Sequence, residues 1–377
     1  MVLDVAETAT RIHADLPVVD GHNDLAWALR IRAGGNLETA DPCGPLDGYH
    51  TDSRRLVRGG VGAQFWSVYI PASNSSPFQS TLEQIDLVRS FIQRCAQLEE
   101  ADTAASVAAI RGRGHTASLL GAEGGHCIEN SLDALRRLRH LGVRYLTLTH
   151  ADTNDWADSA TDEARHGGLT GFGEEVVREM NRIGMIVDIS HVSPDTMRHA
   201  LAVSERPVMA SHSGALAVAS HPRNVPDDVL ELVADNGGVV MVNFYPAFVT
   251  EAASVHGGER LGLARELQRR LGDDAAVEAE LARLLAEDPY PVVTVADVVD
   301  HIEHIAGVAG VEHVGLGSDF DGIDATPVGL EDVSTYPAIT ADLLRRGWDE
   351  AAIRQVLGEN ALRVLAENDV PFPPPVS

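Results

Sequence analysis

The stretch MIVDISHVSPDTMRHALAVS (residues 185–204) places a short apolar run, a turn and the start of a helix in immediate succession. MIVDIS (185–190) is apolar over most of its length, which is typical of a strand covered on both faces. SPDTMRHALAVS (193–204) begins with a serine that can cap a helix and a proline suited to the first helical position. The stretch therefore predicts one strand followed by one helix, with His191 between them.

The same unit repeats along the chain. Apolar runs alternate with helical patterns such as SLDALRRLRHLG (131–142) and GFGEEVVREMNRIG (171–184). The eight runs are LPVVDG (16–21), VGAQFWSVYI (61–70), ASLLGA (117–122), VRYLTLT (143–149), MIVDIS (185–190), PVMAS (207–211), GVVMVNF (238–244) and HVGLGS (313–318). Eight alternations of strand and helix predict a (β/α)8 barrel. A doubly wound open sheet is the alternative, but in such a sheet the eight strands would not close into a ring.

We expect one (β/α)8 barrel domain over residues 1–377, because this length can hold such a barrel with insertions. Residues 246–295 interrupt the alternation with a highly charged helical segment. We interpret this segment as a helical insertion, a solvated pair of helices over one face of the barrel. A lid over the substrate is the alternative.

The chain carries 29 basic and 56 acidic residues, a formal net charge of −27. This excess of negative charge repels nucleic acid and anionic membrane surfaces, so we expect neither as a partner. Apart from histidine, every basic residue is an arginine. Mechanisms that need a lysine Schiff base, or a carbamylated lysine bridging two metals, are therefore excluded.

The cysteines and the apolar segments predict a cellular location. Cys43, Cys95 and Cys127 are odd in number and lack CxxC spacing, which suits a reducing compartment or simple packing roles. The N-terminal residues show no basic segment followed by an apolar one, so we expect no secretory signal. No apolar run approaches the roughly 20 residues of a membrane helix. We therefore expect a soluble cytoplasmic protein.

Residues that bind metals or move protons follow six of the eight predicted strands. They are His22 and Asp24 after the first strand, Glu123 after the third, His150 after the fourth, His191 after the fifth, His212 after the sixth, and Asp319 and Asp321 after the eighth. The carboxyl ends of barrel strands lie on one face, where the active sites of this fold are found. We therefore expect these side chains to lie close together.

Imidazole and carboxylate groups without a thiolate favour a catalytic divalent ion, most often Zn²⁺, with Mn²⁺, Co²⁺ or Fe²⁺ as alternatives. Five candidates are too many ligands for one tetrahedral ion that keeps a water, but they suit two ions that share a carboxylate. These candidates are His22, Asp24, Glu123, His191 and His212. Glu123 is the natural bridge, because the chain has no lysine that could be carbamylated.

Six motifs occur in a fixed order along the chain. They are DGHND (20–24), GAEGGH (121–126), LTLTH (146–150) with WAD (156–158), DISHVS (188–193), SHS (211–213) with RNVPDD (223–228), and GSDFDG (317–322). This ordered set closely resembles the membrane (renal) dipeptidase family of binuclear zinc metallopeptidases, from about residue 16 to at least residue 322. The resemblance implies a (β/α)8 barrel of the metal-dependent hydrolase type that holds two zinc ions and hydrolyses dipeptides.

The resemblance also implies a role for each metal ligand. His22 and Asp24 would hold one ion, His191 and His212 the other, and Glu123 would bridge them. The animal members are secreted, disulfide-linked and lipid-anchored. This chain lacks an anchor signal and has an odd number of cysteines, so it is identified as a bacterial cytoplasmic relative.

Three further residues are expected to act on the substrate by the same resemblance. His150 would contact the oxygen of the scissile carbonyl, Arg223 would bind the terminal carboxylate, and Asp319 would shuttle a proton. The family often has a second arginine just before Arg223, where this chain has Pro222; the following motif still fixes the register. Only the resemblance separates Asp319 from Asp321, because both alternate to the same side in DFDG.

A mechanism for amide hydrolysis follows from these groups. A hydroxide that bridges two metals is a nucleophile near neutral pH, and one ion with His150 would stabilise the carbonyl oxygen. Asp319 would pass a proton from that nucleophile to the departing amine. Arg223 would confine cleavage to substrates with a free C-terminal carboxylate, including L-Xaa-D-Xaa dipeptides, which the family accepts. Asp321 and Asp152 are candidates for binding a free amine.

Two other functions remain alternatives. The first is another binuclear metal amidohydrolase, a lactonase, a deaminase or a phosphotriesterase, acting on a small substrate that bears a carboxylate. The second is a binding protein that retains the scaffold without catalysis, although none of the expected ligands is missing. The oligomeric state stays open, with a homodimer as one option. We expect the two histidines of HIEHI (301–305) to form only a surface pair.

Overall fold

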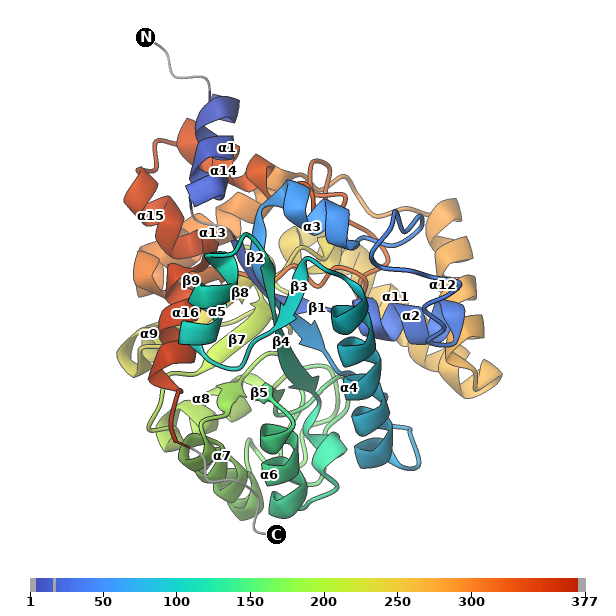
Figure 1. The fold of residues 1–377 in the computed structure, drawn as a ribbon. Coiled ribbons are helices and arrows are strands. Elements are labelled where there is room, and N and C mark those ends of the chain that lie inside the picture. The colour runs from blue at the N-terminus through green and yellow to red at the C-terminus, as the bar shows by residue number, and fades with distance from the viewer. Residues whose placement is uncertain (1–4, 16–17, 372–377) are drawn as a thin grey trace.

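The computed structural model describes residues 5–15 and 18–371, apart from the side chains of residues 259–261 and 265. Eight parallel strands close into a barrel, and helices surround it (Figure 1). The barrel strands are β1 (Val18–Asn23), β2 (Val61–Ser67), β4 (Thr116–Glu123), β5 (Val143–Thr147), β6 (Ile186–Asp188), β7 (Met209–Ser213), β8 (Val239–Val242) and β9 (Val314–Leu316). Each lies within or overlaps one of the eight predicted runs, although residues 16 and 17 of the first run lie outside the described residues.

Closure of the sheet decides between the two predicted architectures. The strand order is β2-β1-β9-β8-β7-β6-β5-β4, and β2 pairs with β4 to complete the ring. This last pairing is parallel and runs from Ala63 opposite Ala117 to Ser67 opposite Gly121. The (β/α)8 barrel is therefore confirmed, and the open doubly wound sheet is excluded. One short strand, β3 (Leu98–Glu100), was not predicted; it pairs with the first residues of β4.

The helices that connect and cover the strands follow the predicted alternation. They are α1 (Val5–Asp15), α2 (Leu25–Ala33), α3 (Ser53–Gly59), α4 (Pro77–Arg94), α5 (Ala104–Arg111), α6 (Leu132–His140), α7 (Gly171–Ile183), α8 (Pro194–Val203), α9 (Asp227–Asn236), α10 (Pro246–Val249), α11 (Glu251–Leu271), α12 (Asp274–Glu287), α13 (Val295–Ala309), α14 (Pro337–Arg345), α15 (Glu350–Arg354) and α16 (Asn360–Glu367). The predicted cap of α8 is confirmed, because the Ser193 side chain accepts a hydrogen bond from the backbone N–H of Thr196.

Alternation along the strands builds two cores. Every second residue of a strand belongs to one cluster. Its members include Phe65 of β2, Leu119 of β4, Tyr145 of β5 and Met241 of β8. The residues between them, such as Trp66, belong to a second cluster shared with the surrounding helices. Each strand is thus buried on both faces, which explains why the runs read as continuously apolar.

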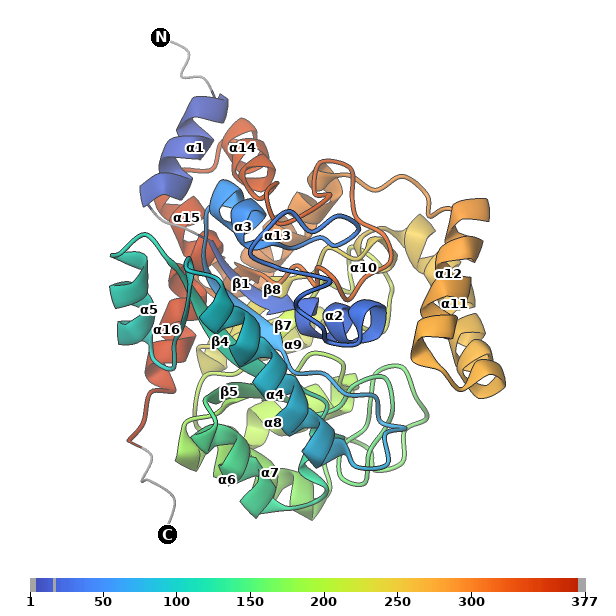
Figure 2. The ribbon, with the colours of Figure 1, turned by 45° about the vertical axis from the view of Figure 1, so that its right-hand side comes forward.

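The predicted insertion contains α10, α11 and α12. Figure 2 shows α11 and α12 lying together at one side of the molecule, outside the ring of helices that covers the barrel. Val277 is the buried side chain of α12, and Glu278 of the same helix pairs with Arg32 of α2 at 2.6 Å. The interpretation of residues 246–295 as a solvated insertion therefore stays a prediction, as does the alternative of a lid. Within the described residues, no helix combines the length and the apolar content needed to cross a bilayer.

Two predictions about individual residues are wrong. Cys43 and Cys95 form a disulfide, whereas the sequence indicated unpaired cysteines; Cys127 is free and buried, as expected. His301 of the HIEHI segment is 1% exposed and lies in the core, not on the surface. His304, one turn later on α13, does pair with a surface carboxylate, that of Asp227. Both errors come from contacts between segments that are distant in the sequence.

Candidate metal centre

Glu123, the last residue of β4, lies between two groups of histidines. Its Oε2 is 3.4 Å from Nε2 of His22. Its Oε1 is 3.0 Å from Nε2 of His191 and 3.4 Å from Nε2 of His212. Asp24 adjoins the first group, with Oδ2 at 3.2 Å from Nε2 of His22. The two oxygens of one carboxylate thus face two different sets of donors.

Two of the histidines are oriented by side chains behind them. The Tyr145 hydroxyl lies 2.7 Å from Nδ1 of His22 and 3.3 Å from the carbonyl oxygen of Gly21. A hydroxyl that donates to this carbonyl accepts from Nδ1–H, which leaves the lone pair of His22 on Nε2. Gly121 makes this possible, because a Cβ there would lie 2.0 Å from the Tyr145 ring.

His212 is held in the same way through a serine. Ser211 Oγ donates to Asp188 Oδ2 at 2.7 Å and lies 2.7 Å from Nδ1 of His212. Asp188 also accepts hydrogen bonds from Thr147 Oγ1 and from the backbone N–H of Ser211. This chain of contacts turns Nε2 of His212 toward Glu123. Such outer contacts usually fix the tautomer and direction of a metal-binding histidine.

The donors fit divalent metal ions. Nε2 of His22 and Oδ1 of Asp24 are buried and have no hydrogen-bond partner. Buried polar atoms without partners are rare, and both of these atoms are of the kind that coordinates a divalent cation. The imidazole and carboxylate groups fall into three sets whose donor atoms lie within 4.8 Å of one another: His22, Asp24 and Glu123; Glu123, His150 and His191; and His22, His212 and Asp319.

Backbone strain is concentrated at the same place. His191, Asp319 and Asp321 have φ angles of 66°, 65° and 66°, in the left-handed region. This conformation costs a residue other than glycine about 1–2 kcal/mol. Strain of this kind persists where the surrounding structure enforces it, and it clusters at functional sites. His191 and Asp319 belong to the donor sets described above; among the described residues, Glu129 and Asn130 are the other non-glycine residues with a positive φ, 49° and 57°.

Asp319 and Asp321 diverge although the sequence makes them equivalent. Asp319 Oδ2 accepts a hydrogen bond from Asn243 at 2.9 Å. Desolvation raises the pKa of Asp319 to about 8; His22 opposes this shift, and the negative charges of Asp24 and Glu123 add to it. Asp321 instead binds the loop before α3, since its Oδ1 accepts from the backbone N–H of His50 at 2.7 Å. Asp319 therefore faces the donors, whereas Asp321 anchors a loop.

His150 lies at the edge of the centre. Its Nε2 is 3.9 Å from Glu123 Oε1, and 24% of its side chain is exposed. Its ring packs against Tyr69 and His191, with centroids 4.5 and 4.4 Å away. Burial lowers the pKa of His150, and the negative charges of Glu123 and Asp152 oppose this shift. Asp152, the other candidate for binding an amine, is exposed. Of the four histidines of the centre, His150 is thus the most accessible to solvent.

Arg223 is a buried cation close to these groups. It is 2% exposed, and it donates to the carbonyl oxygen of His212 at 3.2 Å and to Ser213 Oγ at 3.5 Å. Its Nε has no hydrogen-bond partner, and among the described residues no carboxylate lies within ion-pair distance of it. Burial lowers the pKa of Arg223 to about 10, against the attraction of Asp319 and Glu123. A buried guanidinium with unused donors is suited to a carboxylate ligand.

Gly322 supports the centre from behind, and we predict a strong effect of adding a methyl group there. A Cβ on Gly322 would lie 2.3 Å from Asp24 Oδ2 and 2.7 Å from Asp319 Oδ1. Gly322→Ala should therefore displace both carboxylates, weaken metal binding by at least about tenfold and lower kcat. The matched control is Gly258→Ala on α11, where an added Cβ meets nothing within 4 Å. Equal zinc affinity in the two variants, measured by isothermal titration calorimetry, would show that Gly322 has no supporting role.

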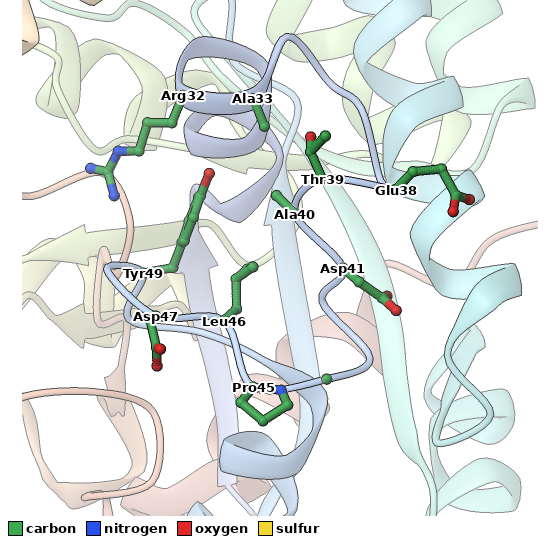
Figure 3. Close-up of a pocket in the computed structure, with 11 residues that line it drawn as sticks. Arg32, Ala33, Glu38, Thr39, Ala40, Asp41, Pro45, Leu46, Asp47 and Tyr49 are labelled. Carbon is green, nitrogen blue, oxygen red and sulfur yellow. The ribbon is translucent and has the colours of Figure 1, made fainter.

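A separate pocket of about 440 Å³ lies in the loop that follows α2. Figure 3 shows Arg32 and Ala33 of α2 on one side and the loop residues Glu38, Asp41 and Leu46 on the other. Arg32 is already paired with Glu278, and its guanidinium lies 5.1 Å from the Tyr49 ring centre. None of the predicted site residues lines this pocket.

Three residues that contact the predicted site residues were not predicted from the sequence. Tyr145 contacts the predicted ligand His22, Ser211 contacts the predicted ligand His212, and Asn243 contacts the predicted proton shuttle Asp319. The tyrosine carried a signal, because a hydroxyl on a fully buried strand needs a polar partner. Ser211, next to His212, carried none, since serine is common at strand ends.

Comparison with known proteins agrees with the geometry. Residues 6–370 match the family described as membrane dipeptidase (peptidase family M19). The chain is 39% identical to dipeptidase verJ of Clonostachys rogersoniana over 376 residues, covering 96% of this chain and 87% of that protein. The probable dipeptidase PvdM of Pseudomonas aeruginosa has the same fold, with a TM-score of 0.81 at 23% identity and coverage of 97% and 98% of the two chains.

One similar structure contains a ligand. A metallopeptidase from Rhodobacter sphaeroides, solved with a phosphinate mimic of the dipeptide L-Ala-D-Ala, aligns with a TM-score of 0.76 at 26% identity. The alignment covers 94% of this chain and 99% of that one. The family match therefore extends over the barrel and the whole candidate centre.

Proposed function

The chain belongs to the membrane dipeptidase family, peptidase family M19, and we propose that it hydrolyses dipeptides with a free C-terminal carboxylate, including L-Xaa-D-Xaa dipeptides. The observation that carries this proposal is the position of Glu123 between two sets of metal donors, with the unpaired guanidinium of Arg223 close by. The dipeptide mimic bound by the Rhodobacter sphaeroides relative supports the substrate class.

The metal ligands would divide into two groups around Glu123. His22 and Asp24 would hold one ion, and His191 and His212 the other, because they face opposite oxygens of Glu123. We propose Zn²⁺, with Mn²⁺, Co²⁺ or Fe²⁺ as alternatives, since the donors are imidazole and carboxylate without thiolate. When bound, two such ions supply an activated hydroxide and positive charge for the carbonyl oxygen.

The remaining residues would position the substrate and move the proton. Arg223 would bind the terminal carboxylate through its unused donors. His150, on the accessible side, would donate a hydrogen bond to the scissile carbonyl oxygen as negative charge develops there. Asp319 would accept a proton on its carboxylate and return it to the nitrogen of the departing amine.

Other features of the proposal follow the sequence. We propose that the whole barrel acts as one catalytic domain, with residues 246–295 as an insertion, and that a homodimer is one oligomeric option. A cytoplasmic location stays a prediction, and the Cys43–Cys95 disulfide weighs against it because such bonds are rare in a reducing compartment. Another amidohydrolase or a lactonase acting on a small carboxylate-bearing substrate is the second candidate, since Arg223 would serve it equally.

We predict that Arg223→Met weakens substrate binding and leaves the metals in place. The methionine keeps an apolar stem but removes the charge and the donors, so KM for a dipeptide should rise about 100-fold with a smaller change in kcat. Hydrolysis of the C-terminal amide of the same dipeptide should hardly change. The control is Arg198→Met on α8, which removes an exposed pair with Asp228. An unchanged KM in Arg223→Met would refute the carboxylate contact.

A substrate screen tests the proposed function itself. The zinc-loaded protein is offered L-Xaa-L-Xaa and L-Xaa-D-Xaa dipeptides, their C-terminal amides, and a panel of lactones. Release of free amino acids from the unblocked dipeptides alone supports the proposal. Hydrolysis of lactones without hydrolysis of any dipeptide would favour the second candidate.

A further inference from the structure

His301 of α13 is buried and makes one hydrogen bond with each ring nitrogen. Nδ1 accepts from the backbone N–H of Ala215 at 2.9 Å, and Nε2–H donates to the carbonyl oxygen of Val249 at 2.9 Å. Since one ring nitrogen accepts and the other donates, the imidazole is neutral. Burial favours the same state, lowering the pKa of His301 to about 4. The side chain thus joins two backbone segments that are remote in the sequence.

The first segment is the loop that carries Arg223. It leaves β7 at Gly214 and returns at Val225, whose backbone N–H donates to the carbonyl oxygen of Gly214 at 2.8 Å. Ala215 pairs with Val225 at this crossing. His301 therefore binds the base of the loop at Ala215, which lies opposite Val225, and Val225 is two residues after Arg223. The contact is close, because a Cβ on Gly214 would lie 2.8 Å from His301 Nδ1.

The second segment is α10, which supplies the surface beneath the guanidinium. Cζ of Arg223 lies 5.2 Å from the ring centre of Phe248, the residue before Val249. The His221 ring packs on the same phenylalanine, with centroids 4.4 Å apart. Asn224 also reaches this helix, donating to the carbonyl oxygen of Phe248 at 2.8 Å. The loop and α10 are thus held together on both sides of Arg223.

We propose that His301 is a positioning residue for Arg223, and that its imidazole sets the direction of the guanidinium by fixing the Arg223 loop against α10. The inference rests on the proposed role of Arg223 in binding the substrate carboxylate. An arginine that stacks on an aromatic ring keeps its donors directed only while the ring stays in place. Loss of either backbone contact of His301 removes one of the contacts that fix the two segments against each other, and leaves the Asn224 and His221 contacts to Phe248 to hold them alone. The hydrogen bonds of His301 go to the backbone of Ala215 and Val249, and within the described residues none of them joins it to a proposed metal ligand.

The test uses His301→Leu, which removes both hydrogen bonds but keeps an apolar side chain in the core. With L-Ala-D-Ala as substrate, KM should rise about tenfold while kcat and zinc content stay within about twofold of the parent. The preference for L-Ala-D-Ala over its C-terminal amide should fall by a similar factor. His301→Gln and His301→Asn, which retain a donor or an acceptor, should restore part of the loss. The control is His304→Leu on the same helix, which should leave KM unchanged.

A double-mutant cycle separates this inference from the proposed function. In an Arg223→Met background, His301→Leu should change KM by less than about twofold, because there is no longer a guanidinium to position. An equal rise in both backgrounds, or an unchanged KM in a folded His301→Leu protein, would overturn the role of His301. If Arg223→Met alone leaves KM unchanged, the proposed contact of Arg223 with the substrate carboxylate fails instead, whereas a failure of dipeptide hydrolysis itself is detected by the substrate screen. Should His301→Leu not fold, the Gln and Asn variants provide the same cycle, and identical KM values for them and the parent would also overturn the inference.

Discussion

Asp319→Asn is expected to lower kcat by about 10³-fold while the protein keeps its metal content and its fold. Asparagine preserves the shape of the side chain and can still contact Asn243, but it cannot take up a proton at neutral pH. The loss should appear in kcat and not in KM, because Asp319 acts on the proton and not on the substrate carboxylate. Steady-state kinetics with metal analysis of the same samples measures both effects.

Asp321→Asn is the matched comparison, since it makes the same change two residues away. Asp321 holds His50 and its loop, so this variant should lose stability more than turnover. If Asp321→Asn abolished turnover while Asp319→Asn remained fully active, the proton-transfer role would belong to Asp321. The two carboxylates that the sequence leaves equivalent would then have exchanged roles.

Glu123→Gln is expected to weaken metal binding by at least about 100-fold and to abolish hydrolysis as a consequence. The substitution preserves volume but replaces a carboxylate between imidazole groups with a neutral amide, which offers one weakly binding oxygen. Both ions should be affected, because the two oxygens of Glu123 face different donor sets. Competition with a zinc-binding dye measures the affinity, and the shift in melting temperature on zinc addition provides a second measurement.

Glu83→Gln is the control for the loss of a carboxylate charge, because Glu83 pairs with Arg30 at the surface and is not among the candidate metal donors. It should bind zinc as the parent does. A Glu123→Gln protein that bound zinc with parental affinity would remove the bridging role of Glu123 from the account.

The barrel strands could be predicted from short stretches of sequence, because each strand is a continuous run of apolar residues. Each run of β-branched and aliphatic residues is covered on both faces, so its apolar character is continuous and visible. The ligand positions followed from the same regularity, since barrel strands present their carboxyl ends on one face. His22, Glu123 and His212 could therefore be assigned to one site before any contact between them was known.

Contacts between distant segments could not be predicted in this way. Cys43 and Cys95 are 52 residues apart and meet because the loop after α2 folds onto the end of α4. His301 resembles any histidine on an amphipathic helix until the Arg223 loop and α10 are packed around it. The sequence indicates only that the buried Tyr145 hydroxyl needs some polar partner. That this partner is His22, and that the Ser211 hydroxyl contacts His212, is visible only in the structure.

The most direct test of the central claim is anomalous diffraction at the zinc edge from crystals of the zinc-loaded protein. The account predicts two peaks within coordination distance of the two oxygens of Glu123, one beside His22 and Asp24 and the other beside His191 and His212. No peak at Glu123, or zinc bound only elsewhere on the chain, would contradict it.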